Sequence, residues 1–307
     1  MNTIVSNNSE SRAADRTKTP RPREVYKIIN TRLSHLGELP LNRAFSGEFT
    51  NYVSPFYVVD EFGPVTLSPH APFRVDAHPH AGIIPTTYLL EGDSHHRDSL
   101  GNDYQYTKGD FLVFTAGKGA LHMEETGGKL FANGGTFHGF QTWLNIPSRL
   151  KFSEPYTELF REKEIPLVHG NGYSVKVLLG DAFGTRSNAR TLFPVLYLHV
   201  TMQAGALLEL PVDPAHNAFV YMMQGEIEVA DGKAAHRREV VLYHREGDVL
   251  RISCSSPAEF LILGGEANNE RYVAYGPFVL NNKHEIAKAF EDFGAGRMGD
   301  PVRVNGR

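Results

Sequence analysis

The sequence predicts an all-β protein built from two tandem antiparallel β-barrels and closed by a short C-terminal helix. Three observations support this fold class. Short apolar runs alternate with Gly, Asp, Asn and Pro along most of the 307 residues, which is the pattern of strands and turns. Similar segments recur about 135 residues apart, the size of one small domain. One segment near the carboxyl end has the apolar spacing of a helix.

The predicted strands are runs rich in Val, Ile, Leu, Phe and Tyr. A first strand is expected at residues 25–29. A polar stretch at 98–103, with Gly101 available for a positive φ, predicts a hairpin turn. The other clear runs are residues 56–59, 86–90, 111–114, 142–144, 175–179, 195–200, 219–223, 240–243 and 260–263.

The internal repeat pairs residues 87–92 with residues 220–225. In both copies an apolar strand ends at Gly, and a later Gly-Asp turn opens another apolar strand. Two similar barrels in tandem are the simplest interpretation of this repeat. The expected regions are a disordered tail at 1–24, a first domain at 25–153, a linker at 154–169, a second domain at 170–299 and a tail at 300–307.

The predicted helix begins after Asn282, because Asn is a good N-cap, and stops at Gly294. We expect it to pack on a barrel through one apolar face, which contains Ile286, Ala289, Phe290 and Phe293.

Composition excludes several classes of protein. Hydrophobic residues make up 41% and charged residues 21%, which is ordinary for a globular protein with a full core. The net charge of −4 argues against direct nucleic-acid binding and against an anionic membrane surface. Cys254 is the only cysteine, so disulfides within the chain and cysteine-rich zinc sites are excluded. No apolar run is long enough for a membrane span or a signal peptide, which predicts a cytoplasmic location.

Two short motifs predict a metal site. His78 and His80 are two residues apart, as are His122 and Glu124. In a strand, side chains at i and i+2 point to the same face, so two facing strands would bring three imidazoles and one carboxylate together. Pro79 places the first pair on an edge strand or at a bulge, because proline cannot donate to a strand ladder.

This ligand set indicates one divalent transition metal with open positions. Three imidazoles and a carboxylate suit iron(II), nickel, cobalt, copper, zinc or manganese. A closed structural zinc site would instead favour thiolates, which are absent. Glu124 is also the ligand that could accept a proton from a substrate hydroxyl.

For the other candidate residues, a structural role is favoured over a role in metal or substrate binding. His95 and His96 are adjacent, so at most one could face the cavity, and His138 is expected in the core or on the surface. Asp60 and Glu61 are expected to stabilise a turn. Three aromatic side chains could line a pocket for a flat substrate, although a core role is favoured for each: Tyr57, Phe140 and Trp143.

Several motifs resemble those of the pirins, a family of the cupin superfamily, in the same order along the chain. The resemblance covers roughly residues 25–299 and rests on residues 54–63, 78–82, 86–92, 96–99, 115–124, 139–147 and 275–281. It implies a bicupin whose N-terminal barrel carries the metal and whose C-terminal barrel has none. The second copy indeed lacks a His-x-His pair and offers only His216 near the equivalent place.

The resemblance also implies the ligands and the chemistry. The family's metal ligands correspond to His78, His80, His122 and Glu124, and iron is the expected metal. Some pirins resemble quercetin 2,3-dioxygenases, which open a flavonol ring with dioxygen, and others resemble metal-dependent transcriptional cofactors without enzymatic activity.

The sequence departs from the family pattern near the metal. Ala81 stands where pirins usually have Arg, and Pro85 replaces an acidic residue. Changes beside metal ligands can cost roughly 10–100-fold in metal affinity or activity. Met123 replaces a Ser, but its side chain should point away from the metal.

The sequence therefore predicts a metal-dependent dioxygenase that acts on a flavonol-like or enediol-like substrate with O2. Its partners would be a small aromatic molecule and dioxygen, with His78, His80, His122 and Glu124 as ligands and Glu124 also as base. The alternative is a regulatory protein whose metal state controls binding to a protein partner. Another cupin activity, such as an isomerase, is a third hypothesis. A cavity that reaches the metal and holds two or three fused rings would favour the enzyme.

Overall fold

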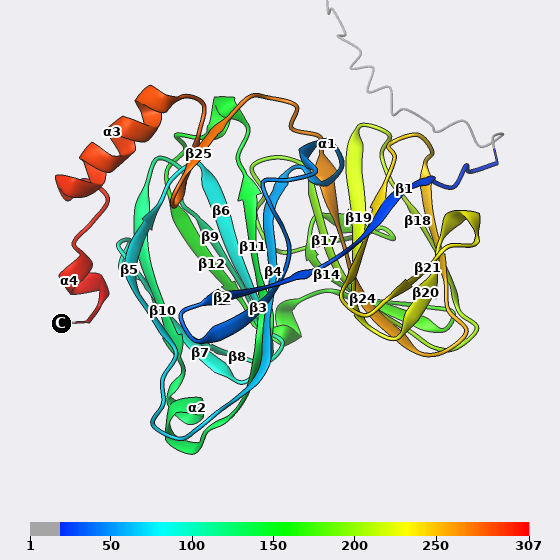
Figure 1. Cartoon of the computed structure of the whole chain (residues 1–307), viewed down its shortest axis with the longest axis horizontal. Coiled ribbons are helices and arrows are strands. Elements are labelled where there is room, and N and C mark those ends of the chain that lie inside the picture. Colours follow the sequence, from blue (N-terminus) through cyan, green and yellow to red (C-terminus); the bar gives the residue numbers. More distant parts are fainter. Residues whose placement is uncertain (1–18, 307) are drawn as a thin grey trace, which may run out of the picture.

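The computed structural model describes residues 19–306, which form two β-domains lying side by side (Figure 1). Most of the tail expected at 1–24 lies outside the described residues. Each domain consists of a seven-stranded and a four-stranded antiparallel sheet. Each of the strand runs predicted from the sequence falls within a strand of the structure.

In the first domain, a large sheet and a small sheet enclose the candidate site. The large sheet runs, in spatial order, β12 (Tyr156–Phe160), β9 (Phe111–Thr115), β6 (Ile83–Glu91), β11 (Gly135–Asn145), β4 (Phe56–Leu67), β3 (Leu39–Ser46) and β2 (Arg32–Leu36). The small sheet runs β5 (Arg74–His80), β10 (Ala120–Thr126), β7 (Asp93–Asp98) and β8 (Asp103–Thr107).

The second domain repeats this plan. Its large sheet runs β1 (Val25–Asn30), β22 (Glu239–Tyr243), β19 (His216–Gln224), β24 (Ala258–Glu266), β17 (Val195–Met202), β14 (Tyr173–Leu179) and β13 (Leu167–Gly170). Its small sheet runs β18 (Leu207–Pro211), β23 (Val249–Ser253), β20 (Glu226–Glu228) and β21 (Ala234–His236). A separate short hairpin joins β15 (Asp181–Ala182) to β16 (Thr185–Arg186).

The two large sheets pack against each other. Strands β6 and β19, which carry the predicted repeat, hold the same place in their sheets, and their Tyr88 and Tyr221 both enter one shared apolar cluster. The neighbouring repeat residues face the domain interiors. Thr87 lines a cavity in the first domain, whereas Val220 is part of the apolar core that fills the second. The repeat thus predicts that the two domains share a fold. Where the two copies differ, as at Thr87 and Val220, one domain has a cavity and the other has an apolar core.

The domain boundaries differ from the predicted ones. Strand β1 pairs with β22 and so belongs to the second domain, although it opens the described chain. The predicted linker contains β12 of the first domain and β13 of the second. Arg23, within the expected tail, is buried and donates to the carbonyls of Asp213 and His216. These pairings join segments far apart in sequence, which a local pattern cannot show.

The C-terminal segment packs on the first domain rather than the second (Figure 1). It contains the hairpin β25 (Val273–Tyr275) to β26 (Phe278–Leu280), α3 (Lys283–Gly294) and α4 (Pro301–Val304). The predicted cap is confirmed, because the Asn282 side chain accepts from the Glu285 N–H at 3.0 Å. The segment expected as a tail at 300–307 contains α4 in its described part, and α4 buries Val304.

Two further short helices, α1 (Thr50–Val53) and α2 (Gly128–Asn133), connect strands of the first domain. Within residues 19–306, none of the helices is both long and apolar enough to cross a membrane.

Candidate metal centre

Strands β5 and β10 bring the predicted histidines together. They pair antiparallel, with His78 directly opposite His122 and His80 opposite Ala120. β5 is an edge strand of its sheet, as the proline between its histidines predicts. The alternate residues of β10, Leu121 and Met123, face the other way and pack against the C-terminal segment. Met123 therefore points away from the centre, as expected.

The three imidazoles converge. Their ring centroids lie 4.4 Å apart for His78 and His122, and 5.0 Å apart both for His78 and His80 and for His80 and His122. One ring nitrogen from each lies within 4.8 Å of the others. That spacing is compatible with a single cation bound between them.

Hydrogen bonds fix which nitrogens are free. Nδ1 of His78 lies 2.9 Å from the Asp76 carbonyl, and Nδ1 of His80 lies 3.1 Å from the Pro277 carbonyl. A carbonyl only accepts, so both Nδ1 atoms carry the proton and both Nε2 atoms keep a lone pair. Buried His122 has no hydrogen-bond partner on either nitrogen among the described residues. An unpartnered buried imidazole beside two free Nε2 atoms fits a bound divalent metal.

Burial also keeps these imidazoles neutral. It lowers the pKa of His78, lowers that of His80 well below its usual range, and lowers that of His122 to about 3. The neighbouring imidazoles act in the same direction, because a charge on one opposes a charge on the next. All three are therefore available as ligands at neutral pH.

Glu124 lies beside His122, but its oxygens have other partners. Oε1 accepts from Nδ1 of His96 at 2.7 Å and lies 3.5 Å from Nδ1 of His122, while Oε2 accepts from the Tyr106 hydroxyl at 2.9 Å. Burial would raise the pKa of Glu124, but the charge on His96 and the hydrogen bond from His96 lower that pKa to about 2. The carboxylate belongs with His96 and His122 in a second group of possible ligands. Its coordination of a metal stays a prediction.

His96 is the residue that the sequence interpretation undervalued. It lies on β7 opposite Glu124, and its Nε2 is 3.2 Å from Asp98 Oδ2. Burial would lower the pKa of His96, but Glu124 and Asp98 together raise it to about 9. His96 therefore forms a charged bridge between two carboxylates. The adjacent His95 instead bonds Asp103 and Glu125.

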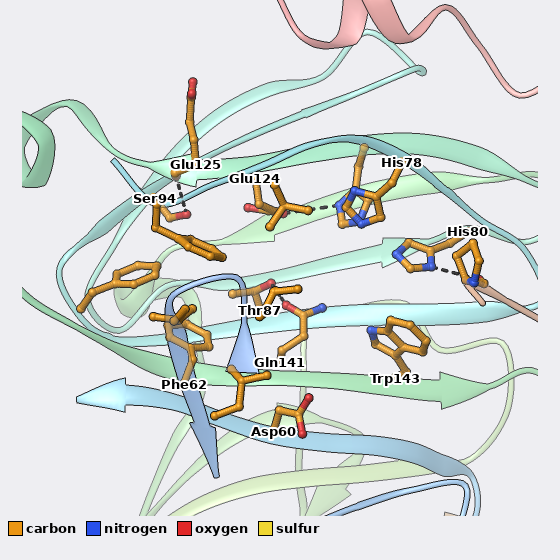
Figure 2. Close-up of a pocket in the computed structure, with 18 of the residues that line it drawn as sticks. Asp60, Phe62, His78, His80, Thr87, Ser94, Glu124, Glu125, Gln141 and Trp143 are labelled. Atoms are coloured by element: carbon orange, nitrogen blue, oxygen red, sulfur yellow. Dashed lines mark hydrogen bonds and ion pairs between the residues drawn. The ribbon is translucent and has the colours of Figure 1, made fainter. Parts of the chain in front are cut away.

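A cavity of about 310 Å³ lies beside the three imidazoles, between the two sheets of the first domain. Its volume is at the lower end of the range for pockets that bind small organic molecules, about 300–1,000 Å³. Figure 2 shows His78 and His80 across the cavity from Gln141 and Trp143. Its apolar lining is Leu36, Leu39, Leu41, Phe62, Phe73, Val75, Phe137, Trp143 and Pro277, and its polar lining is Asp60, His78, His80, Thr87, Ser94, Tyr106, His122, Glu124, Glu125 and Gln141.

Of the three predicted aromatic residues, Trp143 lines this cavity, and its ring centroid is 4.9 Å from that of His80. Phe140 faces the opposite side of the sheet and contacts Tyr221 of the second domain. Tyr57 lies next to Trp143 but outside the cavity lining.

The predicted turn role of Asp60 and Glu61 is wrong, because both lie within strand β4. Asp60 lines the cavity and is paired with Arg43, whereas Glu61 faces the second domain. His138 bonds Glu61 at 2.9 Å and does not line the metal cavity.

The two departures from the family pattern lie in different places. Ala81 is buried beneath the C-terminal segment and forms a bridge with Phe278, so it does not face the cavity. Pro85 is buried in β6 directly opposite Trp143. Neither residue is part of the cavity lining, although Pro85 is the cross-strand neighbour of Trp143, which is.

The second domain has no comparable centre among the described residues, where both clusters of possible metal ligands lie in the first domain. Its interior is filled by Val, Leu, Ile, Met and Phe side chains. His216 begins β19 and belongs to neither cluster.

Comparisons with known proteins agree with this geometry. The family profile described as Pirin matches residues 39–144, and the profile described as the Pirin C-terminal cupin domain matches residues 197–299. A pirin-like protein of Solanum lycopersicum is 34% identical over 285 residues, covering 91% of this chain and 94% of the relative.

Among solved structures, a quercetin 2,3-dioxygenase from Acinetobacter baumannii superposes with a TM-score of 0.86 and 28% identity, covering 92% of this chain and all of that chain. A bacterial pirin from Escherichia coli, solved in complex with nickel(II), superposes with a TM-score of 0.62 and 19% identity. It covers 78% of this chain and 99% of that one, and at this identity it supports the fold alone.

Proposed function

This chain belongs to the pirin family of cupin proteins, and from that membership we propose that it is a metal-dependent dioxygenase that opens the ring of a flavonol-like substrate with O2. One observation carries the proposal: three neutral imidazoles converge at the wall of a cavity whose exposed surface is mostly apolar. A regulator that works through its surface would not need such a cavity.

The residues that would hold the metal are His78, His80, His122 and Glu124. Iron(II) is our proposed metal, and the nickel complex of the E. coli pirin makes nickel the first alternative to test. A bound cation would supply positive charge that acidifies a substrate hydroxyl, and redox chemistry that lets dioxygen react with a closed-shell ring.

The chain's own residues would bind and orient the substrate. Apolar side chains such as Phe62, Phe137 and Trp143 remove water and cover a flat ring system. Glu124, held as a carboxylate by His96 and Tyr106, would accept the proton of the substrate hydroxyl. Because the pKa of Glu124 is about 2, this transfer requires a hydroxyl that is already strongly acidified.

The test is dioxygen consumption with quercetin by protein reconstituted anaerobically with iron(II), with metal content measured in the same sample. We expect metal-dependent uptake together with release of one ring carbon as carbon monoxide. The variant His78→Ala should lose most of its metal and its uptake in parallel. His169→Ala, an exposed change on β13, should retain both.

Two other outcomes have defined meanings. Unchanged metal content in His78→Ala would contradict the ligand assignment. A fully metallated sample without uptake would exclude quercetin as substrate and favour the regulatory alternative, in which metal state controls a protein partner.

A further inference from the structure

Gln141 on β11 lines the cavity, and the N–H groups of its side-chain amide have no hydrogen-bond partner among the described residues. It lies two residues before Trp143, so both side chains project from the same face of the strand. Its Oε1 accepts a hydrogen bond from the Thr87 hydroxyl at 2.9 Å. Its Nε2 has no hydrogen-bond partner among the residues described. Figure 2 shows this nitrogen on the side away from Thr87, toward the space between the imidazoles and Trp143.

The neighbouring strands fix this orientation. Thr87 lies directly opposite Gln141 on β6, and Asp60 lies directly opposite it on β4. Asp60 accepts hydrogen bonds from Arg43 through both oxygens, at 2.8 and 2.6 Å, and none from the Gln141 amide. The amide is therefore held through its oxygen, while its two N–H groups stay free for a ligand.

We propose that Gln141 is the substrate-orienting donor of this cavity. Its amide N–H binds a carbonyl or oxide oxygen of a planar ligand whose adjacent oxygen is held at the three-imidazole centre. The ligand class selected is a flat ring system with two neighbouring oxygens on one edge, such as a 3-hydroxy-4-oxo flavone. Trp143 covers the ring beside this edge. This assignment rests on the proposed function and names the edge of the substrate that the chain recognises.

The experiment measures binding rather than turnover. Zinc-loaded protein is titrated with 3-hydroxyflavone under argon, and binding is followed by quenching of the fluorescence of Trp143, the only tryptophan of the chain. Zinc has no redox chemistry, so the ligand stays intact. Bound zinc is quantified for every variant, which separates a lost metal from a lost contact.

Gln141→Leu should weaken 3-hydroxyflavone binding about tenfold, the usual effect of losing one hydrogen bond to a charged or strongly polar oxygen. Gln141→Glu should weaken it at least as much, because the carboxylate has no N–H and repels the ligand oxygen. Thr87→Val should have a smaller effect, since the amide remains but is no longer held. Gln105→Leu, the same change at an exposed position on β8, should bind like the wild type.

The outcomes separate the two proposals. Equal affinity for wild type and Gln141→Leu, at equal zinc content, would overturn the role of Gln141 and leave the proposed function standing. Absence of binding by zinc-loaded wild-type protein would overturn both the role of Gln141 and the flavonol-like substrate.

Discussion

At the scale of single residues, the three imidazoles reach one point but are restrained differently. His78 is held by a carbonyl of its own strand, and His80 by the carbonyl of Pro277, almost 200 positions along the chain. His122 is positioned by packing, with its ring centroid 4.7 Å from that of Phe114 in a stacked arrangement. Among the three imidazoles, His122 is therefore the one whose burial has no compensating hydrogen bond, and we expect it to be the most sensitive to acid.

The depressed pKa values predict acid sensitivity of the metal-free protein. The unfolded chain protonates histidine near pH 6.5, whereas folded His122 does so only at about pH 3. Below pH 6.5 the unfolded state thus binds more protons, and the free energy of unfolding falls as the pH falls. We expect His122→Asn to reduce this slope by up to about 1.4 kcal/mol per pH unit between pH 6 and 5.

Urea unfolding of metal-free protein at several pH values measures this slope. His169→Asn, an exposed change, should leave it unaltered. His96 should show the opposite sign, because its raised pKa stabilises the fold below pH 6.5 and this contribution is lost as the pH rises through about 9. Parallel curves for His122→Asn and the wild type would contradict the assignment.

At the scale of elements, strands β5 and β10 depend on the C-terminal segment for their outer cover. A Cβ atom at Gly82, just after β5, would lie 2.1 Å from the Val279 carbonyl, so only glycine permits this approach. The buried amine of Lys151 joins the same two segments. It donates to the carbonyls of Gly82 at 3.1 Å and Val279 at 2.8 Å, and to Asn145 Oδ1 at 2.5 Å. The segment that carries Pro277 is thereby fixed against strands β5 and β10.

We expect Lys151→Met to destabilise the protein by about 1–3 kcal/mol, because the carbonyls of Gly82 and Val279 and the amide oxygen of Asn145 each lose a hydrogen bond from the buried amine. Metal affinity should fall as well, since the Pro277 carbonyl that holds His80 becomes less well positioned. Thermal unfolding with and without metal measures both effects. Lys118→Met, which removes an exposed ion pair with Glu154, should change stability by less than about 1 kcal/mol. Similar results for the two variants would contradict the role of Lys151.

At the scale of the whole molecule, the repeat produces matching contacts between the two large sheets. Tyr221 of the second domain donates to Glu61 of the first at 3.0 Å, and Glu61 also accepts from His138. In the other direction, the Tyr88 hydroxyl lies 2.8 Å from Nδ1 of His199, whose Nε2 donates to a glutamate, Glu259.

The residues of these two hydrogen-bond chains occupy equivalent positions in the two large sheets. Glu61 is opposite Phe140, two residues after His138, and His199 is opposite Leu261, two residues after Glu259. At these equivalent positions, the first domain has Glu61 where the second has His199, and His138 where the second has Glu259. The two domains are therefore joined by a quasi-symmetric pair of buried hydrogen-bond chains.

We expect Tyr221→Phe to lower the free energy of unfolding by about 1–3 kcal/mol, because buried Glu61 loses a donor. Tyr88→Phe should cost less, since His199 keeps its bond to a partly exposed carboxylate. Urea unfolding measures both variants. Tyr275→Phe, which alters a largely exposed ring, is the matched control. A loss no greater than that of the control would show that these contacts do not stabilise the domain pair.

Local sequence patterns were sufficient to predict much of the fold and the convergence of the three imidazoles. The apolar runs predicted strands because alternation and β-propensity act within a few residues. The His-x-His pair of β5 predicted two side chains on one face, since the side-chain period of a strand is two. The Asn282 cap needed only the four residues that follow it. The repeat predicted two domains of one plan.

Strand partners and registers were decided by the tertiary structure. An apolar run indicates a strand but not its neighbour, so the pairing of β1 with the second domain and the packing of the C-terminal segment on the first were not predicted. The same applies to His96 beside Glu124 and to Gln141 beside Thr87, which meet only through cross-strand registers. The pattern within each strand was thus enough to predict which imidazoles converge, whereas the groups that surround them come from distant segments brought together by non-local pairing.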